Sequence, residues 1–200
     1  MEQYTIPNQQ SGDQTDIVEE KQLSTEEEAK ELFLQAKQRL FDINHWEEIS
    51  EGISASFNLT DNFGNLKTGV PKAGDYFKID IPGPGPTAGE GHDWVKVEAI
   101  EDYSAPDASQ ESVSVRVRPS HDPRMDEGTA HFFDSKATSS FVVKREKNMV
   151  SASIHGRNES SNTAAKSISD KLRNAVVKIA AAAGLSAIQW KKLAKGLVNR

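Results

Sequence analysis

Histidines are the residues of this chain best suited to acid–base or metal chemistry. His92 and His121 are each followed by an aspartate, but neighbouring residues of a strand point to opposite faces, so such an aspartate does not orient the imidazole beside it. No His–His or Glu–His pair has the spacing of a metal-binding helix. The chain has no cysteine, which excludes disulfides, zinc–thiolate sites and thiol nucleophiles. We therefore predict no metal site and no cofactor.

A second polar cluster occupies residues 155–159 and contains His155, Arg157 and Glu159. It follows the last expected strand and precedes a helix, where side chains can converge on a ligand. The structural alternative is that Gly156 makes a bend, Arg157 pairs with Glu159 or another neighbour, and an asparagine caps the helix. We favour the structural alternative. No Gly-x-Ser-x-Gly motif is present, so the sequence does not predict a serine hydrolase.

The stretch 81–94 is rich in proline and glycine and ends in His92-Asp93-Trp94. It lacks the Gly-Lys-Ser/Thr ending of a phosphate-binding loop and opens no helix. The favoured interpretation is a long connection between two strands. The alternative is a flap over the mouth of a pocket, since loops of this length often serve a function.

Charge divides the chain into an acidic front and a basic rear. Residues 144–200 hold twelve Lys and Arg against three acids, or +9, so the net charge of −6 leaves −15 on residues 1–143. The basic part could bind an anionic partner; we favour basic helix faces that lie against an acidic sheet. No aromatic residues alternate with Arg116, Arg118 or Lys144, so we predict no nucleic-acid binding. The sequence suggests no signal peptide and no membrane span, and a cytoplasmic location is expected.

The expected elements begin with a disordered polar tail over residues 1–23, followed by a single α+β domain over 24–200. Ser24 and Glu27 fit a capping box, and a helix is predicted from there to residue 42. Its apolar face comprises Ala29, Leu32, Phe33, Ala36 and Leu40.

Five or six antiparallel strands should follow, because alternating patterns succeed one another without crossover helices. They are predicted near residues 53–59, 76–81, 94–100, 113–118, 138–145 and 149–155, and Phe132 with Phe133 could begin another short strand. On the third strand, Val95, Val97 and Ala99 are predicted to share one face.

The C-terminal part is predicted to be helical. A long apolar stripe runs from Ile168 to Ala183, Gly184 is placed to end that helix, and Ser186 with Gln189 forms a second capping box before a short helix. The predicted fold is therefore α+β, with an antiparallel five- to six-stranded sheet packed on a long C-terminal helix and an N-terminal helix beside it.

This element order, from about residue 25 to residue 183, resembles the helix-grip fold of the START and pollen-allergen (SRPBCC) superfamily. The expected order departs from the common pattern of that superfamily in one respect, since no strand precedes the first helix. The resemblance implies a cavity between the sheet and the C-terminal helix that accepts an apolar or amphipathic small molecule.

The leading hypothesis is thus a binding module for a small apolar ligand, without demonstrated catalysis. Its predicted pocket walls and mouth are Phe57, Phe77, His92, Trp94, Val115, Phe141, His155, Arg157 and Leu172. One alternative is an interaction or assembly protein that uses its divided charge. Another is an enzyme that uses His155, Arg157 and Glu159, or His92 and Asp93, on a bound small molecule. No prediction of the oligomeric state follows from the sequence.

Overall fold

The computed structural model describes residues 6–50, 55–80, 92–105, 107–124, 136–159 and 187–199. In chain order the elements are β1 (Asp13–Gln22), α1 (Glu26–Phe41), the 3-10 helix η1 (Ile43–His45), α2 (Trp46–Ile49), β2 (Ser56–Thr60), β3 (Tyr76–Asp80), β4 (Asp93–Tyr103), β5 (Gln110–Ser120), β6 (Thr138–Glu146) and β7 (Met149–Glu159). A final helix covers residues 187–199.

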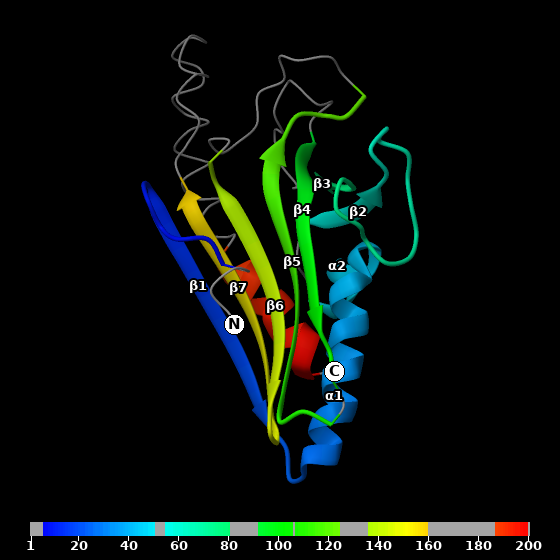
Figure 1. The fold of residues 1–200 in the computed structure, drawn as a ribbon. Coiled ribbons are helices and arrows are strands. Elements are labelled where there is room, and N and C mark those ends of the chain that lie inside the picture. Colours follow the sequence, from blue (N-terminus) through cyan, green and yellow to red (C-terminus); the bar gives the residue numbers. More distant parts are fainter. Residues whose placement is uncertain are drawn as a thin grey trace.

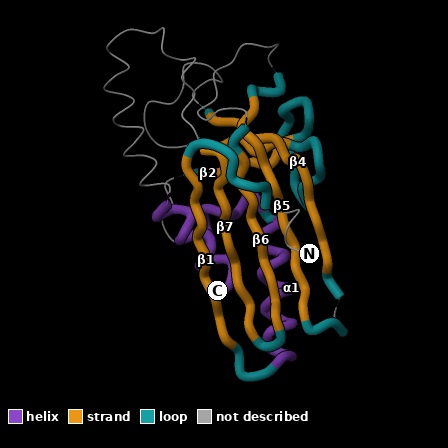
Figure 2. Tube along the Cα trace, turned by 60° about the vertical axis from the view of Figure 1, so that its left-hand side comes forward, coloured by secondary structure: helices purple, strands orange, loops and turns teal. Residues whose placement is uncertain are grey.

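The strands form one antiparallel sheet in the order β1-β7-β6-β5-β4-β3-β2 (Figure 1). The described helices all lie on one side of this sheet, which we call the inner face (Figure 2). Helix α1 contacts β6 and β7, while η1 and α2 contact β2. The structure therefore confirms the α+β helix-grip arrangement, with seven strands in place of the predicted five or six.

The additional strand is β1, in a segment predicted to be disordered. All of its residues except Ile17 and Val18 are charged or polar, so its composition is typical of a disordered tail. Its order comes from the tertiary structure, because β1 pairs along β7, with Ile17 opposite Ile154. The Asn158 side chain also accepts hydrogen bonds from the backbone amides of Gln10 and Ser11. A strand therefore does precede the first helix, as in the common helix-grip pattern.

Helix α1 begins one residue later than the sequence motif predicts. Thr25 is the N-cap: its hydroxyl accepts from the Glu28 amide, and the Glu28 carboxylate accepts from the Thr25 amide. The assignment of the capping box to Ser24 and Glu27 was therefore wrong in register. The predicted apolar face is confirmed, since Ala29, Leu32, Phe33, Ala36 and Leu40 are all buried.

The six predicted strands are present as β2 to β7, with different ends. Strand β4 has an irregularity at Glu98, where the register shifts between Val97 and Ala99. Val97 lies opposite Val117 on the inner face, whereas Ala99 lies opposite Arg116. A bulge of this kind adds one residue and reverses the faces beyond it, so Ala99 does not share a face with Val97 as predicted.

Several predictions fall outside the described residues: the Pro/Gly stretch 82–91, Phe132 and Phe133, and the long helix from Ile168 that includes Leu172. The short helix predicted after Ser186 is confirmed at residues 187–199. Its Leu193, Ala194, Leu197 and Val198 are completely buried. None of the helices among the described residues has the length and apolar character that crossing a membrane requires.

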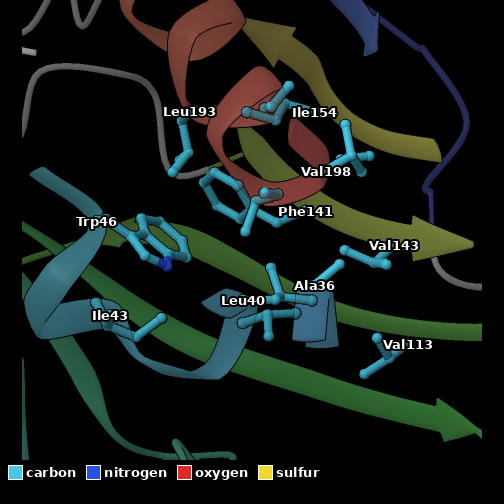
Figure 3. Close-up of a cluster of buried hydrophobic side chains, with 14 of the residues drawn as sticks. Ala36, Leu40, Ile43, Trp46, Val113, Phe141, Val143, Ile154, Leu193 and Val198 are labelled. Carbon is cyan, nitrogen blue, oxygen red and sulfur yellow. The ribbon is translucent and has the colours of Figure 1, made fainter. Parts of the chain in front are cut away.

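The hydrophobic core lies between the inner face and the helices. Figure 3 shows Leu40 of α1, Trp46 of α2 and Leu193 of the last helix pointing toward Phe141 and Ile154 of the sheet. Each such buried side chain stabilises the fold by about 1.5–3 kcal/mol. The core therefore fixes the last helix against the sheet and against α2.

Candidate functional site

Four of the predicted pocket residues come together on the inner face. Phe57, Phe77, Val115 and Phe141 project from β2, β3, β5 and β6, and each is at most 3% exposed. They are covered by two tryptophans. The ring of Trp46 lies 4.8 Å from that of Phe141 and 5.3 Å from that of Phe57.

Trp190, from the last helix, completes this aromatic cluster. Its ring lies 5.8 Å from that of Phe57 and 5.5 Å from that of Phe141. Such distances and tilted geometries are those of direct aromatic packing. The middle of the inner face is thus filled by protein side chains, and the aromatic cluster forms a floor for anything that binds nearer the end of the sheet.

The described residues cover the inner face less at one end of β3 and β4, the end at the top of Figure 1. Ile79 lies opposite Phe57 on one side and opposite Asp93 on the other. Ile79, Asp93 and Val95 are only partly buried, whereas Phe57 and Phe77 below them are buried. Apolar surface and one carboxylate therefore remain accessible directly beside the aromatic floor.

Asp93 is the polar group of this end. Burial raises the pKa of its carboxyl, and the nearby charge of His92 opposes that rise. Among the described residues, no side chain or amide donates a hydrogen bond to it. A buried carboxylate without a donor is unfavourable, so Asp93 is an acceptor available to a ligand. The sequence offered Asp93 only beside His92, as a catalytic alternative.

A second carboxyl group lies on the same end of the sheet, at β7. Glu159 accepts a hydrogen bond from the Thr15 hydroxyl at 2.7 Å, and its carboxylate covers Gly156 so closely that a Cβ there would meet it at 2.3 Å. Burial, together with the charges of Asp13 and Asp16, raises the pKa of Glu159. Asn158 has φ 56°, in the left-handed region, which turns the chain so that Glu159 lies on the inner side.

His155 and Arg157 lie on the opposite, outer face of the sheet, next to β1. The Asp16 carboxylate lies 2.6 Å from Nδ1 of His155 and 2.7 Å from a terminal nitrogen of Arg157. The structure therefore separates His155 and Arg157 from Glu159, and Arg157 pairs with Asp16. Three side chains that are near in sequence do not converge on one pocket.

His92 and Trp94 also lie away from the inner face. Trp94 pairs with Lys78 and Ser120 in the sheet, and the Arg124 guanidinium lies 5.5 Å from its ring centre. The Trp94 indole nitrogen is buried and has no hydrogen-bond partner among the described residues. His92 lies 3.8 Å from the Asp80 carboxylate. These two predicted residues are thus separated from the aromatic floor by the sheet.

The described residues contain no group of three His, Asp or Glu placed to hold a metal ion. Leu172, the remaining predicted pocket residue, lies outside the described ranges. The sequence patterns did not identify Trp46 and Trp190 as the side chains that cover the predicted walls, because that depends on how the last helix docks on the sheet.

No family model and no curated protein matches this sequence. Solved structures of similar shape exist. The hypothetical protein jhp0584 from Helicobacter pylori is 14% identical over 92% of this chain and 84% of that chain, with a TM-score of 0.44. Protein Ms6760 from Mycobacterium smegmatis is 12% identical over 94% and 91%, with a TM-score of 0.43.

Norcoclaurine synthase from Thalictrum flavum is 10% identical over 97% of this chain and 99% of that chain, with a TM-score of 0.37. Identities and scores this low say nothing about ligand or activity. The helix-grip arrangement itself rests on the order of the strands and the position of the helices described above.

Proposed function

We propose that this protein binds a small amphipathic molecule at the end of the inner face formed by β3 and β4. The apolar part of the ligand would lie against Ile79 and Val95, above the aromatic floor of Phe57 and Trp190. The observation that carries the proposal is Asp93, a partly buried carboxylate with a raised pKa and no donor among the described residues.

The chemistry of this end favours a ligand with a hydrogen-bond donor or a positive charge. A cationic group beside a carboxylate in a partly apolar site gains more than it does in water, because the effective dielectric constant is lower. Partly buried apolar side chains next to a few polar groups are typical of small-molecule sites. An amine attached to a short hydrocarbon chain combines both properties.

The test compares three probes that share a ten-carbon chain: decylamine, decanol and decanoate. Binding is followed by the fluorescence of the tryptophans, since Trp190 borders the site, and by calorimetry. We expect decylamine to bind at least about tenfold more tightly than decanoate, a difference of about 1.4 kcal/mol. Asp93→Asn should remove this preference and leave decanol binding unchanged.

Asp80→Asn is the matched control, because Asp80 is an aspartate of the neighbouring strand that lies near His92 instead of the inner face. It should keep the preference for decylamine. If none of the three probes binds the wild-type protein, or if Asp93→Asn retains the preference, the proposal is wrong.

A second candidate function, protein–protein association, is favoured by the loop between β2 and β3. Phe63, Leu66 and Val70 are each more than half exposed there. The loop is nonetheless held firmly: the Asp61 carboxylate accepts from the Phe63 and Asn65 amides. A rigid loop that presents three apolar side chains to solvent is typical of a contact surface.

Sedimentation of the wild type and of Leu66→Ser tests this candidate. Association through the loop predicts a concentration-dependent increase in mass that Leu66→Ser reduces and that high salt does not weaken, since salt screens only charge contacts. Association through the acidic front and the basic rear of the chain would instead weaken at high salt. If the wild-type protein is monomeric at all concentrations, the loop does not mediate self-association.

A further inference from the structure

Outside the proposed ligand site, the outer face carries a hydrogen-bonded chain of three side chains. Ser153 and His155 are two residues apart on β7 and therefore share a face. Asp16 lies opposite His155 on β1. The Asp16 carboxylate is 2.6 Å from Nδ1 of His155, and Nε2 of His155 is 2.9 Å from the Ser153 hydroxyl.

The chemistry of the groups sets the direction of these hydrogen bonds. An ionised carboxylate can only accept, so Nδ1 of His155 carries the proton that it donates to Asp16. Nε2 of the neutral imidazole is then an acceptor, and the Ser153 hydroxyl donates to it. This is the arrangement in which a histidine acts as the base for a serine nucleophile.

Arg157 holds Asp16 in place for this role. It donates to the Asp16 carboxylate at 2.7 Å and to the backbone carbonyls of Thr15 and Gly156. Burial alone would raise the pKa of Asp16, but the hydrogen bonds from Arg157 and His155 and the charge of Arg157 hold it below its ordinary value. Asp16 therefore remains a charged acceptor at neutral pH.

Ser153 is partly exposed, and its surroundings are partly apolar. Val18 of β1 and Val142 of β6 lie opposite Ser153 on its two sides, and Val18 is more than half exposed. The helices among the described residues pack on the inner face. A short hydrocarbon group could rest on the two valines while its carbonyl carbon reaches the Ser153 hydroxyl.

We propose that Ser153 is a nucleophile, activated by His155 and Asp16, that accepts short acyl groups from activated esters. Ser153 Oγ attacks the carbonyl carbon, and its proton passes to Nε2 of His155. The bond to the leaving alcohol then breaks, and the alcohol departs with that proton. The product is an acyl ester of Ser153, which water hydrolyses to the carboxylic acid with His155 again acting as the base.

The sheet limits this reaction to esters with good leaving groups. Strand β7 is paired on both sides, with β1 and β6, so its backbone amides are engaged in the ladder and do not form an oxyanion hole. We therefore expect one acyl group to transfer rapidly to each molecule and slow turnover afterwards.

p-Nitrophenyl acetate is the probe, used with the whole 200-residue chain. The wild type should release a burst of about one equivalent of p-nitrophenolate and gain one acetyl group, located on Ser153 by digestion and mass spectrometry. Ser153→Ala should abolish the burst. His155→Gln should slow it by about 100-fold or more, the size expected for loss of a general base.

Ser151→Ala is the matched control, because Ser151 lies on the same face of the same strand, four residues from His155, or about 13 Å along the strand. It should leave the burst unchanged. Melting curves of all variants identify any that fail to fold, and Asp16→Asn, which keeps the size of the side chain, should lower the burst rate.

Acetylation of Ser151 or of lysines at the same rate as Ser153, stable acetylation of His155, or a full burst in Ser153→Ala would overturn the proposal. So would a folded wild type that is not acetylated at all.

Discussion

Arg145 and Glu111 form a buried ion pair at the end of the sheet opposite to Asp93. The guanidinium Nε donates to the Glu111 carboxylate at 2.7 Å, and the side chains are 0% and 3% exposed. Arg145 also donates to the backbone carbonyls of Ala108 and Lys147. The pair therefore ties β5 and β6 together, and Arg145 also holds the loop before β5 and the turn after β6.

Removal of one partner of this ion pair should lower the stability of the protein strongly. In Arg145→Met, Glu111 remains buried, with the Ala105 amide as its donor within the described part of the chain, and we expect the free energy of unfolding to fall by about 3–5 kcal/mol. The double variant Arg145→Met/Glu111→Leu should recover much of this loss, because no charge is left unpaired. Urea unfolding measures both; a single variant within about 1 kcal/mol of wild type would contradict the prediction.

Gly196→Ala should destabilise the protein, although alanine ordinarily stabilises a helix by about 1 kcal/mol relative to glycine. A Cβ at Gly196 would lie 2.0 Å from the backbone oxygen of Ile49, so the last helix would have to move away from α2. Such overpacking costs about 1–3 kcal/mol. Thermal unfolding should show the loss, while the exposed neighbour Lys195→Ala changes stability by less than about 0.5 kcal/mol.

At the N-terminus of α1, substitutions of the adjacent residues Ser24 and Thr25 should affect stability differently. Thr25→Ala removes the hydroxyl that accepts from the Glu28 amide and should lower stability by about 1 kcal/mol. Ser24→Ala removes no side-chain cap and should have a smaller effect, below about 0.5 kcal/mol. A larger loss for Ser24→Ala would show that the capping box begins one residue earlier.

Asp122 should make stability depend on pH in the acidic range. The hydrogen bonds of Arg124 hold the pKa of Asp122 below its ordinary value, so its contribution is complete above the unfolded-state pKa of about 3.9 and is lost as the pH falls below it. Asp122→Asn should therefore be less stable than wild type at pH 7, and the difference should shrink toward pH 3. The exposed Asp107→Asn is a control that should change little at either pH.

For Asp93 we expect the opposite dependence of stability on pH. Burial raises the pKa of its carboxyl, so the ionised form opposes folding, and wild-type stability falls as the pH rises through the folded-state pKa. Asp93→Asn should be more stable than wild type at pH 7 and equal to it at low pH, where the carboxyl is protonated. Unfolding without any ligand measures this. An Asp93→Asn protein that is less stable at pH 7 would indicate that Asp93 has a donor within the fold.

Local patterns were sufficient for most elements of this fold. The apolar stripe of α1, the alternation in β5 and the motif after Ser186 each predicted an element that is present, because amphipathic periodicity reflects which side chains face the core. The same patterns placed Phe57, Phe77, Val115 and Phe141 together, since residues of one parity along paired strands share a face.

The tertiary structure alone decided β1 and everything that depends on it. A charged segment with two apolar residues becomes a strand because β7 offers unpaired backbone groups along its edge, and nothing within residues 13–22 encodes that partner. The chain Asp16–His155–Ser153 spans 139 positions between its first two members. The tertiary structure also decided that Trp46 and Trp190 fill the middle of the inner face, because their positions follow from how α2 and the last helix pack. Sequence spacing determines which face a side chain takes on its own element, whereas contacts between distant elements depend on how whole surfaces fit together.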